Sequence, residues 1–469
     1  MTDPSRSPRR IPFGLAISVL AASLGTSAAN VALPGISADL GAPLPQTQWV
    51  TLAYLLSMTA TSLASGHLGD LYGRRRMLMA GAAVFTLGAV VAALAPVLGA
   101  LVAARAIQGA GAAVMMTLPL AIARDTVAAD RLGATMGLLG TTAAVGTASG
   151  PAVGGALMAL SGWPAVFLAM APLGAVAIAL SQPAHDGPRT RVRTRGAYAA
   201  GILLLTAGIA LYALGVTSPG TSEGAPSWLL LACAAAALAV FAVHERRAAH
   251  PILPLSLLRA RGVPRGAVLN LAVGTVMMST LVIGPFYLAG ALGLTPAAIG
   301  IAMAAGPVVS VLTGVPAGRL VDRMSAGRMS TAGLTTMVAG SLALALLPAW
   351  WGLAGYLAGT VLLAPGYQLF LAANNTGVLA EAPPERRGAV SGLLGLSRNL
   401  GLVTGASLMP VLFATASGST LSASAPPGAL DTALRTTFLT TAALLLAAAV
   451  LAALGARQPS AARTGPAEP

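Results

Sequence analysis

The sequence predicts an all-α membrane protein with fourteen transmembrane helices, arranged as two six-helix bundles with two further helices inserted between them. First, 56% of the 469 residues are hydrophobic and only 9% are charged, whereas a soluble domain has about 25% charged residues. Second, apolar runs of about 20 residues, long enough to cross about 30 Å of hydrocarbon, recur along most of the chain. Third, the 55 glycines and 32 prolines suit membrane helices, where small residues allow close packing.

The predicted spans alternate with loops whose arginines fall on one side. We expect spans at residues 13–33, 48–66, 77–95, 98–121, 135–158, 164–182, 197–215, 227–243, 266–288, 297–316, 329–348, 352–376, 388–413 and 434–455. The arginines of one side are Arg74 to Arg76, Arg124 and Arg131, Arg189 to Arg195, Arg246 to Arg265, Arg319 to Arg328, and Arg386 with Arg387. The other side has almost none beyond Arg435. The positive-inside rule therefore predicts a multi-pass protein of the cytoplasmic membrane with both termini in the cytoplasm.

The first span has an alternative interpretation. The segment "SRSPRRIPFGLAISVLAASLGTSAAN" resembles a secretory signal peptide, with its basic start and small-residue end. We favour an uncleaved span, because thirteen more apolar segments follow and cleavage is not needed to explain any of them.

The two halves carry a weak internal repeat. Long inner stretches at 183–196 and 244–265 bracket spans 7 and 8, which predicts three regions: 1–182, 183–265 and 266–469. The loop "SGHLGDLYGRRR" after span 2 is similar to "AGRLVDRMSAGR" after span 10. The matching residues are separated by a constant 252 positions: Gly66 and Gly318, Leu68 and Leu320, Asp70 and Asp322. A parallel repeat of this kind predicts a substrate path between the halves, near the middle of the membrane.

Composition excludes several other functions. The net charge of +14 comes from 27 arginines without any lysine, in short clusters between spans. There is no basic face rich in aromatic residues, so we expect no nucleic-acid partner. A single cysteine, Cys233, cannot form an intrachain disulfide. No nucleotide-binding loop, metal-ligand cluster or nucleophile–base set is recognisable, so we expect no enzyme activity, no cofactor and no metal.

The loop after span 2 has residues suited to a gate. Gly66 and Gly73 permit a tight turn, while Asp70 can cap the next helix or pair with a basic group such as Arg74. Such contacts can hold one face of a bundle shut. The second copy contains Gly318, Asp322 and Arg323, although Ser325 replaces its later glycine. The alternative is an ordinary turn with inner arginines.

Spans 4 and 5 hold the other unusual residues. Arg105 and Gln108 in "AARAIQGAGAAVM" are three positions apart and share a helix face. An arginine within a membrane helix normally faces a cavity or a partner, although one bonded only to backbone carbonyls would be structural. Span 5 contains "GTASGPAVGG", in which glycines form a smooth groove and a proline interrupts the helical bonds; generic small-residue packing is the alternative. Its residues are Gly146, Gly150, Pro151, Gly154 and Gly155.

These motifs together resemble the fourteen-spanner drug:proton antiporter family of the major facilitator superfamily. Further matching stretches are "NVALP", "QWVTLAYLL", "HPILPLSLL" and "GAVSGLLGLSRNLG", so the resemblance covers nearly the whole chain. The resemblance implies the major facilitator fold and efflux of drugs, dyes or self-made antibiotics in exchange for protons. It implies a small-molecule substrate and a chain embedded in the lipid bilayer, which we expect to be a monomer.

The sequence departs from the family at the residue that carries the proton. Gly25 stands where the family has an aspartate in span 1. Two further departures are Trp163-Pro164-Ala165, where the family often has tryptophan-arginine-tryptophan, and Ala289 in place of a glutamine. None of the thirteen carboxylates or four histidines lies within a predicted span. Proton coupling at residue 25 is therefore not expected.

Depth along the helices brings Gly25 and Arg105 to one level. At 1.5 Å per residue, both lie about 20 Å from the inner surface of a core about 30 Å thick. We therefore expect a neutral or anionic substrate that contacts Arg105 and Gln108, with Asn30 and Tyr54 along the path. Arg398 in span 13 is a second basic candidate, unless it reaches the interface by snorkelling.

Alternatives remain open at this point. Arg105 could only brace backbone carbonyls, while Asp39 or a loop acid relays protons. The whole chain could be a proton-independent facilitator or an anion exchanger. It could also be a sensor with a transporter fold, although no inner loop is long enough to form an added soluble domain.

Overall fold

The computed structural model describes residues 10–127, 129–181, 195–217, 226–248, 257, 262–382, 387–418 and 427–456. Within these ranges the chain forms α-helices and no β-strand. The helices are α1 (Arg10–Asp39), α2 (Leu44–Thr47), α3 (Trp49–Tyr72), α4 (Arg74–Ala93), α5 (Leu98–Thr126), α6 (Ala129–Leu168), α7 (Met170–Leu180), α8 (Arg195–Thr217), α9 (Ser227–Arg247), α10 (Val263–Gly290), α11 (Pro296–Arg323), α12 (Ala326–Leu346), α13 (Pro348–Trp351), α14 (Leu353–Glu381), α15 (Arg387–Ala416) and α16 (Pro427–Ala456).

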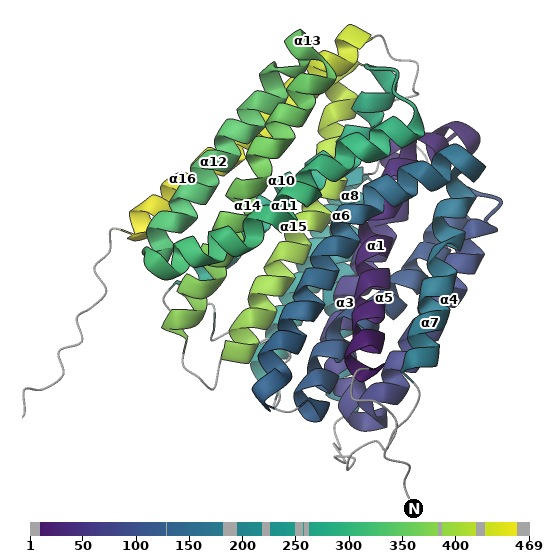
Figure 1. Cartoon of the computed structure of the whole chain (residues 1–469), viewed down its shortest axis with the longest axis vertical. Coiled ribbons are helices and arrows are strands. Elements are labelled where there is room, and N and C mark those ends of the chain that lie inside the picture. Colours follow the sequence, from purple (N-terminus) through teal and green to yellow (C-terminus); the bar gives the residue numbers. More distant parts are fainter. Residues whose placement is uncertain are drawn as a thin grey trace, which may run out of the picture.

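The helices form two halves with the same internal pairing (Figure 1). In the first half, α1 packs on α6, α3 on α5, and α4 on both α5 and α7. In the second half, α10 packs on α15, α11 on α14, and α12 on both α14 and α16. The second set repeats the first in the same order along the chain, as the sequence repeat predicts.

Glycine crossings repeat between the halves as well. A Cβ atom on Gly111 of α5 would lie 2.8 Å from the Cα atom of Phe85 in α4. In α14, a Cβ atom on Gly366 would lie 2.9 Å from the backbone nitrogen of Met337 in α12. Met337 follows Phe85 by 252 positions, the same separation as in the repeated loop. These helices therefore touch through their backbones at equivalent places, which requires glycine at both crossings.

The helices long and apolar enough to cross a membrane number 12 among the described residues. This set counts Leu138–Leu180 once, although that segment has 43 residues, and it omits α3. The segment is interrupted at Ser161 and Gly162, where Gly162 has a φ of +73°, a conformation that favours glycine. The predicted number of fourteen spans is therefore not confirmed.

Helices α8 and α9 pack on each other, and α8 also contacts α3 and α15. The Trp49 indole nitrogen donates a hydrogen bond of 3.1 Å to the hydroxyl of Thr217 at the end of α8. This pair therefore attaches to the seam where one half meets the other. Most of the predicted inner stretches at 183–196 and 244–265 lie outside the described residues.

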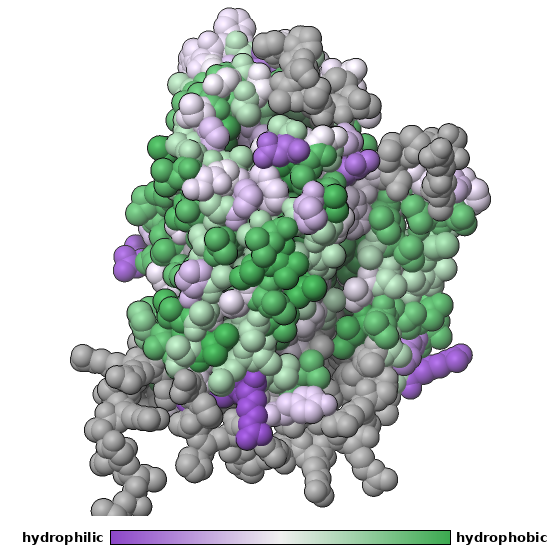
Figure 2. All heavy atoms as spheres, turned by 90° about the vertical axis from the view of Figure 1, so that its right-hand side faces the viewer, coloured by the Kyte–Doolittle hydropathy of each residue, from purple (hydrophilic) through white to green (hydrophobic). Residues whose placement is uncertain are grey.

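The outer surface has the character of a lipid-facing protein. Figure 2 shows hydrophobic side chains over much of the middle of the face formed by the first half. Large apolar residues exposed on α4 and α7 include Leu87, Val91 and Val176. A water-exposed surface of this kind would be unfavourable, whereas hydrocarbon solvates it.

Candidate functional site

Arg105 of α5 is fully buried at the centre of the first half. Its Nε donates to the Val50 carbonyl oxygen at 3.1 Å, and its Nη2 donates to the Gly25 carbonyl oxygen at 3.0 Å. Its Nη1 donates to the Gln108 side-chain oxygen at 2.6 Å. All three nitrogen atoms of the guanidinium therefore have an acceptor, and two of these acceptors are backbone carbonyls of α1 and α3.

Aromatic rings cover the same guanidinium. The Arg105 Cζ atom lies 4.1 Å from the centre of the Tyr54 ring and 5.5 Å from that of Phe167. A cation over a ring face is stabilised most where water is excluded. This geometry favours the alternative in which Arg105 braces the helices. Contact of Arg105 and Gln108 with a substrate stays a prediction, because neither side chain is accessible in this conformation.

The space beside Gly25 is filled by a tyrosine. A Cβ atom at residue 25 would lie 2.9 Å from the Tyr54 hydroxyl oxygen and 3.3 Å from the Phe85 ring. The Tyr54 hydroxyl donates a 2.8 Å hydrogen bond to the Ala22 carbonyl oxygen. An aspartate at residue 25 would therefore require Tyr54 to move. From the sequence we expected Tyr54 to line the substrate path. The sequence did not predict that Tyr54 fills the space beside Gly25.

Asn30 is buried further along α1. Its side-chain nitrogen donates to the Thr26 carbonyl oxygen at 3.3 Å, and its side-chain oxygen accepts a 2.9 Å bond from the Thr51 hydroxyl of α3. Asn30 therefore links α1 to α3 in this conformation, and its predicted place along the path is untested.

The glycines of α6 face two different helices. A Cβ atom on Gly154 would lie 2.7 Å from the Ala28 carbonyl oxygen of α1, and Gly146 and Gly150 face the same helix. A Cβ atom on Gly155 would lie 2.7 Å from the Cα atom of Gly300 in α11. The carbonyl of Pro151 is also next to Gly300. The motif therefore packs α6 on its own half and, through Gly155 and Pro151, on the other half.

The halves meet at one end of the molecule. Gly155 and Gly300 lie toward the end at which α1 finishes and α11 begins, which we call the distal end; α2, at the same end, also contacts α15. At the opposite end, where α1 begins, a Cβ atom on Gly140 of α6 or Gly318 of α11 would meet no described atom within 4 Å. We call this the terminal end. The α6–α11 seam is therefore tight distally and open terminally.

The loop after α3 turns at Gly73, whose φ is +95°. Arg74 then begins α4, and its Nη1 donates to the Ala121 carbonyl oxygen of α5 at 3.3 Å. Gly66 and Asp70 lie in α3, and the surroundings of Gly66 and the side chain of Asp70 are outside the part of the chain that the structure describes. In the second copy, Asp322 and Arg323 are exposed at the end of α11. The gating role of both loops is untested.

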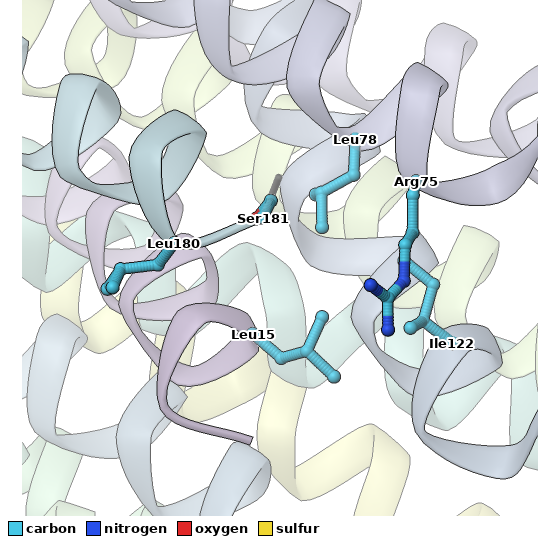
Figure 3. A pocket seen from close by; sticks show the side chains of 6 residues that line it. All are labelled: Leu15, Arg75, Leu78, Ile122, Leu180 and Ser181. Carbon is cyan, nitrogen blue, oxygen red and sulfur yellow. The ribbon is translucent and has the colours of Figure 1, made fainter. Parts of the chain in front are cut away.

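A pocket lies at the terminal end of the first half, where α1 and α4 begin and α5 and α7 end (Figure 3). It contains none of the residues that the sequence predicted for the substrate path or the gate. Its lining residues are Leu15, Arg75, Leu78, Ile122, Leu180 and Ser181.

The helices extend beyond the predicted spans, so that the helical segments long and apolar enough to cross a membrane take in five carboxylates near their ends: Asp39, Glu245, Asp322, Glu381 and Asp431. The expectation that no carboxylate lies within a membrane span stays a prediction. Asp431 accepts a 2.8 Å hydrogen bond from the hydroxyl of Tyr287, which is fully buried on α10.

Comparison with known proteins identifies the family. The sequence profile of the Major Facilitator Superfamily matches residues 15–243 and 266–469. The chain belongs to this superfamily. As a member of the Major Facilitator Superfamily it is a membrane transporter and not an enzyme, and its all-helical fold is that of the superfamily.

Superfamily members of similar sequence include named transporters. The chain is 29% identical to the riboflavin transporter RibZ of Clostridioides difficile, over 85% of this chain and 87% of that protein. It is 31% identical to the cephamycin export protein CmcT of Amycolatopsis lactamdurans, over 91% and 88% respectively. The relatives thus include antibiotic exporters, as the motifs predicted.

A solved structure shares the fold. A bacterial homologue of the human lysosomal transporter Spinster, in an inward-facing and unoccupied conformation, superimposes with a TM-score of 0.71. The match covers 97% of this chain and 98% of the other, at 17% identity. At this identity the comparison supports the superfamily fold alone.

Proposed function

We propose that this chain is a secondary active transporter that exports small organic molecules across the cytoplasmic membrane by alternating access. The observation that carries the proposal is the α6–α11 seam, tight at Gly155 and Gly300 and open at Gly140 and Gly318. A transporter that works by alternating access closes one end of its halves while the other is open. The named exporters among its relatives support the direction of transport.

The proposed topology has fourteen spans. A continuous helix of 43 residues would be about 65 Å long, twice the thickness of the hydrocarbon core. The interruption at Ser161 and Gly162 supports two spans there, and the 24 residues of α3 are long enough for one more. The proposed regions are 1–182, 183–265 and 266–469, and the absence of a profile match at 244–265 supports the second boundary.

The proposed orientation has both termini in the cytoplasm, because the arginines concentrate in loops on that side. The open terminal end then faces the cytoplasm. An exporter collects its cargo from this side, so the conformation corresponds to the cargo-accepting state. We propose a monomer, and a gate in which Asp70 and Arg74 help to close this end.

The proposed cargo is neutral or anionic. A lipophilic cation entering a low-dielectric cavity needs a carboxylate to compensate for lost hydration. Position 25 carries no carboxylate, and the neighbouring space is taken by Tyr54. Since this position cannot carry a proton either, proton-independent transport or anion exchange is the second candidate function.

Everted membrane vesicles test the proposal. Riboflavin and a cephamycin are suitable first compounds because relatives are named for them, followed by a panel of neutral, anionic and cationic dyes. We expect accumulation of at least one neutral or anionic compound in vesicles that contain the chain. Strong accumulation of cationic dyes alone, driven by a pH gradient, would refute the proposed cargo class. Loss of all accumulation would refute export.

A further inference from the structure

Arg398 of α15 differs from Arg105, because its guanidinium has a nitrogen atom without an acceptor. Arg398 is partly exposed and makes no hydrogen bond or ion pair with the residues that the structure describes. Its Nε atom is nevertheless shielded from water and lacks a partner. Buried donors in proteins are almost always bonded, so an orphaned one calls for an explanation. An absent acceptor is the simplest.

Arg398 also lies deep in its helix. It follows the first residue of α15, Arg387, by eleven positions, or about 16 Å at 1.5 Å per residue. This depth is near the middle of a hydrocarbon core about 30 Å thick. An arginine at such a depth is costly unless it faces a partner or a water-filled space.

The face of α15 around Arg398 is open. A Cβ atom on Gly395, three positions earlier and on a neighbouring part of the same face, would meet no atom of the described residues within 4 Å. The same holds for Gly392. Ser391 is exposed one turn nearer the terminal end, and Asn399 next to the arginine is partly exposed. The open face is therefore polar or small-sided along its length.

The other half of α15 differs. Beyond Arg398 the exposed large side chain is Leu408, which lies on a different face of the helix. Lipid-facing positions are expected to be apolar, as Leu408 is, whereas the Gly392–Asn399 face is not. We therefore take the polar face to line the space between the halves, whose distal end is closed where α2 contacts α15.

We propose that Arg398 binds the acidic group of an organic anion on this face of α15. A guanidinium presents a planar fork of donors that matches a carboxylate, sulfonate or phosphate. Arg105 cannot serve in this way in the same conformation, because its three nitrogens are occupied and its faces are covered. The inference rests on the proposed export function for its physiological meaning.

Charged thiol reagents can measure the field of Arg398 without any transport. Gly395→Cys is introduced in a Cys233→Ser background, and the protein is studied in phosphatidylcholine nanodiscs. The modification rate with anionic sulfonatoethyl methanethiosulfonate is divided by the rate with its cationic trimethylammonium analogue. A unit charge about 8 Å away in water should change this ratio about fivefold. We therefore expect Arg398→Gln to lower it about fivefold and Arg398→Lys to preserve most of it.

Arg435→Gln is the matched control, because Arg435 is an exposed arginine of α16 in the same half; it should leave the ratio unchanged. The proposal would be overturned if Gly395→Cys is not labelled at all, or if the ratio of the two modification rates is the same with and without Arg398→Gln. If the difference in this ratio between the native arginine and Arg398→Gln is lost in phosphatidylglycerol nanodiscs, Arg398 is occupied by lipid headgroups, which also overturns the proposal. If the ratio depends on Arg398 as expected but the protein exports none of the compounds, the proposed function is refuted and the anion site is still supported.

Discussion

The hydroxyl oxygen of Tyr54 lies 2.9 Å from the position that a Cβ atom would take on Gly25. The same tyrosine covers one face of the Arg105 guanidinium, whose Nη2 binds the Gly25 carbonyl. Gly25, Tyr54 and Arg105 therefore form one packed unit that joins α1, α3 and α5. Gly25 therefore does more than replace the aspartate of related transporters: this unit can pack only if residue 25 has no side chain.

Gly25→Ala should destabilise the protein, and Tyr54→Phe should relieve most of the effect. The phenylalanine removes the nearest atom and leaves the ring carbon at 3.4 Å. We expect a coupling of about 1 kcal/mol between the two substitutions. Thermal unfolding of the four proteins of this cycle in detergent measures it. Additive shifts in melting temperature would contradict the packing described.

Arg105→Ala should lower the melting temperature strongly, whatever the cargo. It leaves the Gln108 side chain without its partner and opens a cavity between the rings of Tyr54 and Phe167, at a cost of about 3 kcal/mol. Arg105→Lys should recover only part of this, because one ammonium cannot reach three acceptors. Wild-type stability combined with lost transport would instead assign Arg105 to the cargo.

Gly155→Leu should prevent the distal end from closing. Its side chain would meet the backbone of Gly300, which cannot give way. We expect transport to fall more than tenfold while the protein stays inserted in the membrane. Gly99→Leu, at the start of α5 and away from the seam, where a Cβ meets no described atom within 4 Å, is the control and should retain transport. Equal activity of both variants would contradict the role of the α6–α11 seam.

Asp70→Asn should slow turnover without changing cargo affinity, because a gate contact affects interconversion of states more than binding. Initial rates in everted vesicles over a range of cargo concentrations separate the two quantities. Asp322→Asn tests the second copy, whose carboxylate is exposed at the end of α11. Unchanged turnover of Asp70→Asn at equal expression would remove the gate from the account.

The sequence predicted the helices well because membrane spans are long apolar runs. It also predicted that Gly25 and Arg105 lie at one depth, and the hydrogen bond between them confirms this. It could not predict that Tyr54 fills the space beside Gly25, since this depends on how the side chain of a neighbouring helix is oriented. Asp431 lies in a helix and not in a loop because α16 begins at Pro427, seven residues before the predicted span.

The open face of α15 was also beyond the sequence. Whether Arg398 meets water, lipid or protein depends on how the two halves are positioned, and no local pattern encodes this. The repeated loop did predict two halves of the same helix order, and the crossings of α4 with α5 and of α12 with α14 both need glycine. Packing within a half is thus easier to predict than the state of the seam between the halves.

Alternating access between the two halves can be tested by spin-label distances along the α6–α11 seam. In a Cys233→Ser background, one pair of labels is attached at Gly140→Cys and Gly318→Cys, where there is open space. A second pair is attached at the exposed distal positions Leu160→Cys and Ile301→Cys. Double electron–electron resonance then measures both distances in nanodiscs over a range of pH and of cargo concentration. We expect two populations, in which the terminal distance shortens whenever the distal distance lengthens. A single unchanging distance at both ends under every condition would contradict alternating access.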